Sequence, residues 1–193
     1  MGEMIGLAVV LFVVVGGVGY ALSIYNGLVA LRNNIGRSWA NINVLLKQRH
    51  DELPKLIDTC KQYMQHEQNV LENVTKARAG VDIAREKQDI AGLSTAESAL
   101  RGSLGSLFAV AENYPDLKAD QGFNALQNRI TGLENAIADR REFYNDSVNV
   151  NNVRVQQFPD LIVAKLFGFG TLNMLQFARS ELTDVDVSKR FNS

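Results

Sequence analysis

The chain has 193 residues, of which 20 are basic and 21 acidic, so its formal net charge is −1. This balance argues against a nucleic-acid-binding protein, which usually presents a strongly basic surface. One cysteine and two histidines exclude a disulfide scaffold and leave hardly enough ligands for a zinc site. We therefore expect no cofactor and no nucleic-acid partner.

The N-terminal segment carries no charge between Glu3 and Arg32, and residues 4–24 are predominantly apolar. A helix over these residues would be roughly 32 Å long, which matches a hydrocarbon core of about 30 Å. A cleaved signal peptide is the alternative. It would open with a basic residue and close with an Ala-x-Ala exit, and this segment has neither. We expect residues 1–31 to form a transmembrane anchor and its exit.

The orientation of this anchor follows from its flanking charges. The N-terminal side has no basic residue, whereas Arg32, Arg37, Lys47 and Arg49 follow the span. The side with more Lys and Arg tends to remain in the cytoplasm. We expect a single-pass protein of the cytoplasmic (inner) membrane, with its N-terminus outside and its body in the cytoplasm.

The residues after the anchor show a heptad pattern typical of a coiled coil or helical bundle. The a and d positions of this pattern are Ile35, Trp39, Ile42, Leu46, Arg49, Leu53, Leu56, Cys60, Tyr63, Glu67, Val70, Val74, Ala77, Val81 and Ala84. Because the register does not skip at Pro54, we expect one helix from Ile35 to Lys87, about 80 Å long and kinked at Pro54, rather than a turn there. Trp39 should lie on its buried stripe.

Two further helices are expected. Ser94 and Glu97 have the spacing of a capping box and predict a helix that ends at Tyr114 and Pro115. A third helix should run from near Asp120 to Pro159. Its apolar side would consist of Phe123, Leu126, Ile130, Leu133, Ile137, Tyr144, Val148, Val155 and Phe158. The predicted fold is all-α, with the transmembrane helix continuing into a long antiparallel bundle over residues 32–158.

Residues 159–193 form an apolar docking segment and a tail. The apolar side chains of this segment are Leu161, Ile162, Val163, Leu166, Phe167 and Phe169. The run is too short to span a membrane and too apolar to lie free in water. It can pack on its own bundle, or it can dock on a neighbouring subunit or on lipid. We predict a homo-oligomer whose contacts include it, because two shorter helices cannot cover a helix of about 80 Å along its length.

Catalytic and metal-binding patterns fail on spacing. His66 and Glu67 lack a second histidine at position 70, which a zinc-protease helix requires. His50, Asp51 and Glu52 are adjacent on a predicted helix and point in different directions. Cys60 lies on the apolar stripe, where a thiol is desolvated. No strand precedes Gly168 and Gly170, which favours a tight turn over a phosphate site.

The sequence WANINVLLKQRHDELPKL at residues 39–56 resembles the LemA family of bacterial membrane proteins. The resemblance continues in YMQHE at 63–67, ARA at 77–79, ENYPDLK at 112–118, REFYN at 141–145, FP at 158–159 and FGF at 167–169. It implies an N-terminal anchor, a cytoplasmic antiparallel helical body and no established catalytic activity. The family usually closes with an acidic-proline-valine tail, and Val185, Asp186 and Val187 lack that proline.

Two functions follow as hypotheses. The first is a non-enzymatic, membrane-anchored scaffold that self-assembles and organises membrane or partner proteins. The resemblance supports it, because relatives resemble magnetosome-associated proteins and often accompany membrane proteases. The alternative is an accessory regulator of one membrane enzyme, such as an envelope protease. The expected partners are the chain itself, membrane lipid and membrane proteases or other membrane proteins.

Overall fold

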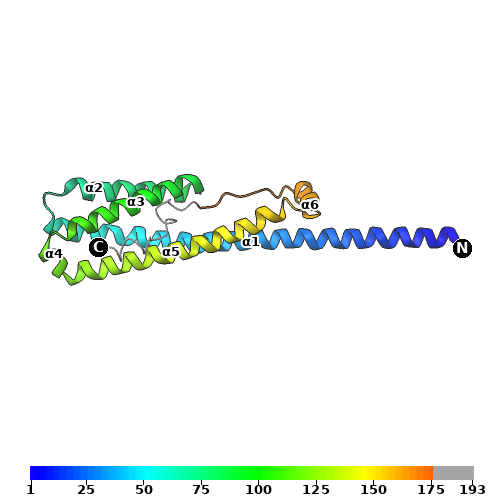
Figure 1. Ribbon diagram of the computed structural model, residues 1–193, viewed down its shortest axis with the longest axis horizontal. Helices are drawn as coiled ribbons and strands as arrows, with labels where there is room; N and C mark the ends of the chain where they lie inside the picture. Colours follow the sequence, from blue (N-terminus) through cyan, green and yellow to red (C-terminus); the bar gives the residue numbers. More distant parts are fainter. Residues whose placement is uncertain (176–193) are drawn as a thin grey trace, which may run out of the picture. The chain divides into compact units, whose positions relative to one another are not determined.

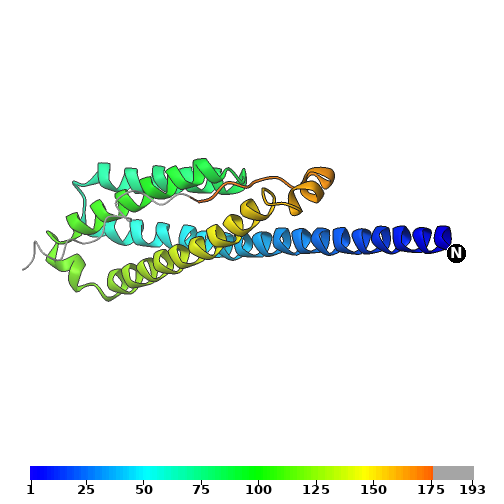
Figure 2. The same cartoon turned by 45° about the vertical axis from the view of Figure 1, so that its right-hand side comes forward.

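The computed structural model describes residues 1–175, which contain six helices and no strand (Figures 1 and 2). The helices are α1 (Gly2–Tyr63), α2 (Gln68–Glu86), α3 (Ile90–Ala111), α4 (Pro115–Ala119), α5 (Gln121–Arg154) and α6 (Asp160–Phe167). The predicted all-α class is confirmed. The tail residues Val185, Asp186 and Val187 lie outside the described residues.

The chain forms two compact units. The first, which we call the anchor unit, combines Met1–Asn41 with Glu142–Met174. The second, the body unit, contains Ile42–Arg141 and resumes at Leu175. Each unit therefore joins segments that lie far apart in the sequence. The predicted division at residues 31 and 158 stays a prediction.

Helix α1 begins with the apolar run and is long and apolar enough to cross a membrane. Pro54 lies inside α1, so the helix continues through the proline as predicted. The prediction of one helix to Lys87 is wrong, because α1 ends at Tyr63 and α2 begins at Gln68. The connection contains Gln65 and His66, both exposed, and Glu67 is the polar residue that interrupts the apolar stripe.

Helix α2 runs antiparallel to the part of α1 that belongs to the body unit. Arg78 of α2 donates to the His50 carbonyl of α1. Arg85, seven residues later in α2, donates to the Asn43 side chain, seven residues earlier in α1. The apolar residues after the break therefore face those before it, which preserves the heptad pattern across a turn. Helices α2 and α3 also lie side by side (Figures 1 and 2).

In the connection between α2 and α3, the C-terminal capping motif of α2 is followed directly by the N-cap of α3. Gln88 adopts a left-handed φ of 53°. The amide of Asp89 donates to the Ala84 carbonyl (3.0 Å) and that of Gln88 to the Arg85 carbonyl (3.1 Å), which is a Schellman motif. The Asp89 carboxylate then accepts from the Gly92 amide as the N-cap of α3. The predicted capping box is therefore wrong, since α3 begins four residues before Ser94.

Helix α5 starts where the sequence predicts, because the Asp120 carboxylate accepts from the Phe123 amide (2.8 Å). Its predicted apolar side is confirmed at Phe123, Ile130, Ile137, Tyr144 and Val148, which are buried. The helix ends at Arg154, before the expected end at Pro159. Phe158 is exposed rather than buried, which corrects its predicted place on the apolar side. The residue before a proline is disfavoured in helical conformation, and the chain has already left the helix there.

Candidate functional site

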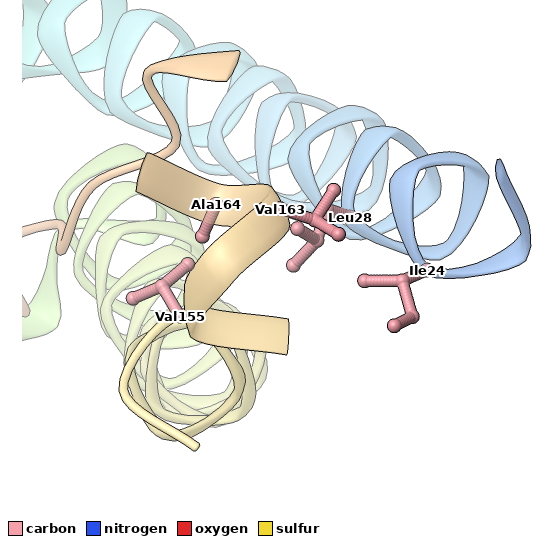
Figure 3. Close-up of a cluster of buried hydrophobic side chains, with 5 residues drawn as sticks. All are labelled: Ile24, Leu28, Val155, Val163 and Ala164. Atoms are coloured by element: carbon pink, nitrogen blue, oxygen red, sulfur yellow. The ribbon is translucent and has the colours of Figure 1, made fainter. Parts of the chain in front are cut away.

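A short apolar helix docks on the anchor helix within the anchor unit. Val163 and Ala164 of α6 are buried together with Ile24 and Leu28 of α1 and with Val155, which follows α5 (Figure 3). Gly168 ends α6 with a left-handed φ of 72°, and the Phe169 amide donates to the Ala164 carbonyl (2.9 Å). This geometry confirms the expected tight turn and returns the chain toward α1.

Aromatic rings close the same contact. The ring of Tyr25 lies 4.7 Å from that of Phe167 and 5.8 Å from that of Phe169, centroid to centroid. Arg154 and Asp160 form an ion pair (2.6 Å) at the junction of α5 and α6. A side chain at Gly27 would meet the Arg154 guanidinium at 2.8 Å, so the guanidinium passes close over α1 at this glycine.

The segment after α6 is held by side-chain amides of α5. Asn152 donates to the Leu172 carbonyl (2.9 Å) and accepts from the Leu172 amide (2.8 Å). Asn151, which is fully buried, donates to the Gly170 carbonyl (3.2 Å). The Tyr144 hydroxyl donates to the Asn173 carbonyl (3.2 Å). The sequence gives no local sign of these bonds, because the acceptors lie 19 and 20 residues from the two asparagines.

The structure divides the predicted interaction segment into two sides. Val163 is buried within its own chain, and Leu161 and Phe169 are half-buried. Ile162, Leu166 and Phe167 are exposed. The six predicted residues therefore come together on α6 and the turn after it. Val163, Phe167 and Phe169 serve the chain's own packing, and Ile162 and Leu166 are left exposed on α6.

The outer side of α5 in the anchor unit exposes a second apolar group. It consists of Phe143, Val150 and Val153, which we call the α5 stripe. Intervals of seven and three residues place these side chains on one side of a helix. The interval was present in the sequence, but the stronger apolar series on the opposite side of α5 obscured it.

The residues predicted to be structural are placed as follows. Leu53 is fully buried in α1, and Pro54 beside it is half-buried. Pro159 directly precedes α6. Trp39 is half-buried and its ring lies 6.1 Å from that of Tyr144, so it packs within the anchor unit without being enclosed.

The core of the body unit contains a buried group of charges, which we call the ionic core. Arg49 of α1 is 2% exposed and pairs with Glu97 of α3, and its second guanidinium nitrogen lies 3.6 Å from Glu134 of α5. Burial raises the pKa of Glu134, and the Arg49 and Arg101 charges oppose that rise. Nearby, Arg129 of α5 pairs with Glu52 of α1 (3.0 Å). Arg49, one of two polar residues in the predicted stripe, thus joins three helices.

The reactive side chains of His50 and Cys60 take part in packing contacts of the body unit. His50 is half-buried against Arg78 (2.6 Å) and lies 3.8 Å from Asp82. Burial and the Arg78 charge lower the pKa of His50. Cys60 is buried, which raises the pKa of its thiol to about 11. Among residues 1–175, no three His, Cys, Asp or Glu side chains are grouped as metal ligands.

An open groove of about 750 Å³ lies where α1 and α2 meet in the body unit. Ile57, Met64 and Leu71 form its apolar floor, and Lys61, Glu72 and Lys76 are among the residues at its edge. Its lining offers a hydrophobic contact edged by charge and no catalytic group.

Comparison with known proteins gives a consistent result. The model of the LemA family matches residues 38–188. Protein LemA of Metamycoplasma hominis is 27% identical over 168 residues, which cover 86% of this chain and 75% of that protein. Magnetosome protein MamQ 2 of Paramagnetospirillum magneticum is 23% identical over 75% of this chain and 62% of its own length. Magnetosome protein MamQ of Magnetospirillum gryphiswaldense is 28% identical over 38% of this chain and 27% of its own length. The match thus spans less than two thirds of the MamQ proteins.

Proposed function

Because the chain belongs to the LemA family and begins with a helix apolar enough to cross a membrane, we propose that it is a non-enzymatic membrane scaffold. In this proposal α1 crosses the cytoplasmic membrane once, and the helical body lies in the cytoplasm. Copies of the chain assemble and organise other membrane proteins. The names of the MamQ relatives, which are magnetosome proteins, support a role in organising a membrane.

The observation that carries self-assembly is the α5 stripe. Phe143, Val150 and Val153 are exposed on a helix that is itself fixed by the packing of Tyr144 and Val148. Exposed apolar side chains grouped on one helix side are typical of a protein interface. We place the self-contact here rather than on residues 161–169, because the inner side of that segment is occupied by α1. Confinement to a membrane raises the effective concentration of the chains and favours such modest contacts.

The test measures the mass of the full chain, purified in mild detergent and then in lipid nanodiscs. We expect several copies of this chain alone. Val150→Lys with Val153→Lys should reduce the complex to smaller species without lowering its melting temperature, since both side chains are exposed. Asn69→Lys, at an exposed position on α2, is the matched control and should leave the mass unchanged. A wild-type chain that is monomeric in both media would contradict self-assembly.

The groove between α1 and α2 favours a second function, that of an accessory regulator of one membrane enzyme. An apolar floor with charged edges fits a segment of a protein partner. The same purified sample separates the two functions. One foreign subunit in fixed stoichiometry, lost on Leu71→Glu, would favour the regulator, whereas many copies of this chain alone favour the scaffold.

A further inference from the structure

Helix α6 carries apolar side chains on two opposite sides, and only one of them is covered by its own chain. Val163 and Ala164 face α1 and are buried. Ile162 and Leu166, four residues apart and therefore on one side of the helix, are 59% and 76% exposed. Phe158, just before α6, is 81% exposed. Ile162 and Leu166 form an exposed apolar side of α6, which we call the α6 surface and which an apolar neighbour would cover.

The position of α6 along α1 indicates what that neighbour is. The inner side of α6 packs on Ile24 and Leu28. Ile24 is the last residue of the apolar run at residues 4–24, and Leu28 lies about one turn, or roughly 6 Å, beyond it. If the run occupies the hydrocarbon core, α6 lies between the end of the acyl chains and the headgroups. An interfacial helix buries its apolar side about 5–10 Å into this same region.

The side chains around α6 fit that depth. Tyr25 and the rings of Phe167 and Phe169 form an aromatic group at the end of the apolar run. Tyr is enriched at this level of membrane proteins, and Phe occurs on the apolar side of interfacial helices. Lys165 is exposed on α6 and long enough to extend its ammonium toward lipid phosphates. The charge of Asp160 is already paired with Arg154, so it does not oppose entry into the interface.

We propose that α6 is an interfacial membrane helix, whose surface of Ile162 and Leu166 is inserted at the headgroup boundary where α1 leaves the bilayer. The anchor unit then meets the membrane twice, through a span and through a helix lying at the interface. This rests on the proposed function only in that α1 crosses the membrane. A second copy of the chain fits this surface less well, because an eight-residue helix is far smaller than the roughly 800 Å² per partner of a stable interface.

The test places nitroxide labels on single added cysteines in the full chain, reconstituted in nanodiscs of phosphatidylcholine and phosphatidylglycerol. The label positions are Ile162→Cys and Leu166→Cys, with Val18→Cys in the span and Asn69→Cys on exposed α2 as controls. Native Cys60 is buried. Wild-type chain treated with the same nitroxide reagent verifies that this cysteine stays unmodified. Collision with oxygen, which partitions into hydrocarbon, is compared with collision with a water-soluble nickel chelate.

We expect the labels at 162 and 166 to have more oxygen access and less nickel access than that at 69, and to lie between it and the label at 18, as depth at the headgroup boundary requires. High nickel access at both positions would overturn the proposal by placing the α6 surface in water. Low access to both reagents would overturn it by showing that protein covers the surface. The mass of the same samples is measured independently, so a multi-copy complex with water-exposed α6 would reject this inference and retain the scaffold.

Discussion

Arg49 shows how one polar residue in an apolar stripe can connect a helical core. Its guanidinium is buried and pairs with Glu97, with Glu134 at 3.6 Å. Removing one member of a buried ion pair leaves an uncompensated charge, which typically costs about 3–5 kcal/mol. Replacing both members with apolar residues of similar size is often neutral. The charges of the ionic core therefore stabilise the body unit mainly by compensating one another, since the loss of one leaves another buried without its counter-charge.

We expect Glu97→Ala to reduce the free energy of unfolding by about 3–5 kcal/mol. The double variant Arg49→Met with Glu97→Leu should recover only part of that loss, because Glu134 then lacks the Arg49 charge. Denaturant titration followed by circular dichroism measures both. Lys61→Ala removes an exposed pair with Asp58 and should cost at most about 1 kcal/mol. Equal losses for the single and double variants would show that packing, rather than charge, determines the effect.

His50 gives the body unit a dependence on pH. Burial and Arg78 lower its pKa below 6.5 in the folded chain, so the unfolded chain binds the proton more tightly. Its contribution to stability is complete above about pH 6.5 and is lost as the pH falls toward the folded pKa. The His50→Gln variant should therefore lose less melting temperature than wild type between pH 7 and pH 5.5. His66→Gln, in the exposed turn after α1, is the control and should retain the wild-type slope.

At the scale of the helices, the sequence predicts where apolar sides lie better than where a helix turns back. Most a and d positions predicted between Ile35 and Ala84 are buried in the structure. The stripe nevertheless crosses a turn at residues 64–67. Because α2 returns along α1, apolar residues on both sides of the turn face one core, and the period survives. Glu67 in the stripe was the one local sign of the break.

The ion pairs and hydrogen bonds between residues far apart in the sequence could not be predicted. A polar Arg49 at a core position indicates a buried counter-charge, but nothing local distinguishes Glu97 from other acids as its partner. The same holds for Asn152, whose bonds reach Leu172. The long apolar helix at the N-terminus, its passage through Pro54 and the turn at Gly168 were predictable, since each depends only on neighbouring residues.

The start of α3 provides a direct comparison between the observed cap and the predicted one. Asp89→Ala removes the acceptor for the Gly92 amide and should cost about 1 kcal/mol. Ser94→Ala should cost less, because the Ser94 hydroxyl donates to Ile90 within the same helix, which adds little to helix stability. Thermal melts of the two variants give the ranking. The reverse order would favour the capping box at Ser94.

At the scale of the whole molecule, the proposed orientation depends on charges that remain exposed beside the span. Arg32, Arg37 and Lys47 are exposed, whereas Arg49 is buried in the ionic core and neutralised there. Three exposed basic residues after the span, against none before it, still favour a cytoplasmic body.

A reporter fused after Ser193 should therefore be active only if it functions in the cytoplasm. Arg32→Glu with Arg37→Glu weakens the asymmetry and should increase the inverted fraction, which protease accessibility in sealed vesicles measures. Activity of a reporter that requires an extracytoplasmic location, fused at the same site in the wild-type chain, would reverse the proposed orientation.

The bonds between Asn152 and Leu172 have a consequence for aggregation. An extended segment leaves a row of backbone amides and carbonyls that can recruit a strand from another chain. Asn152 both donates to and accepts from Leu172, so a side chain occupies the place that one rung of a neighbouring strand would take. Asn151 and Tyr144 occupy the carbonyls of Gly170 and Asn173 in the same way. Side chains on a single face of α5 thus bond backbone groups of residues 170–173 that a neighbouring strand could otherwise use, which disfavours edge pairing where the chain leaves α6.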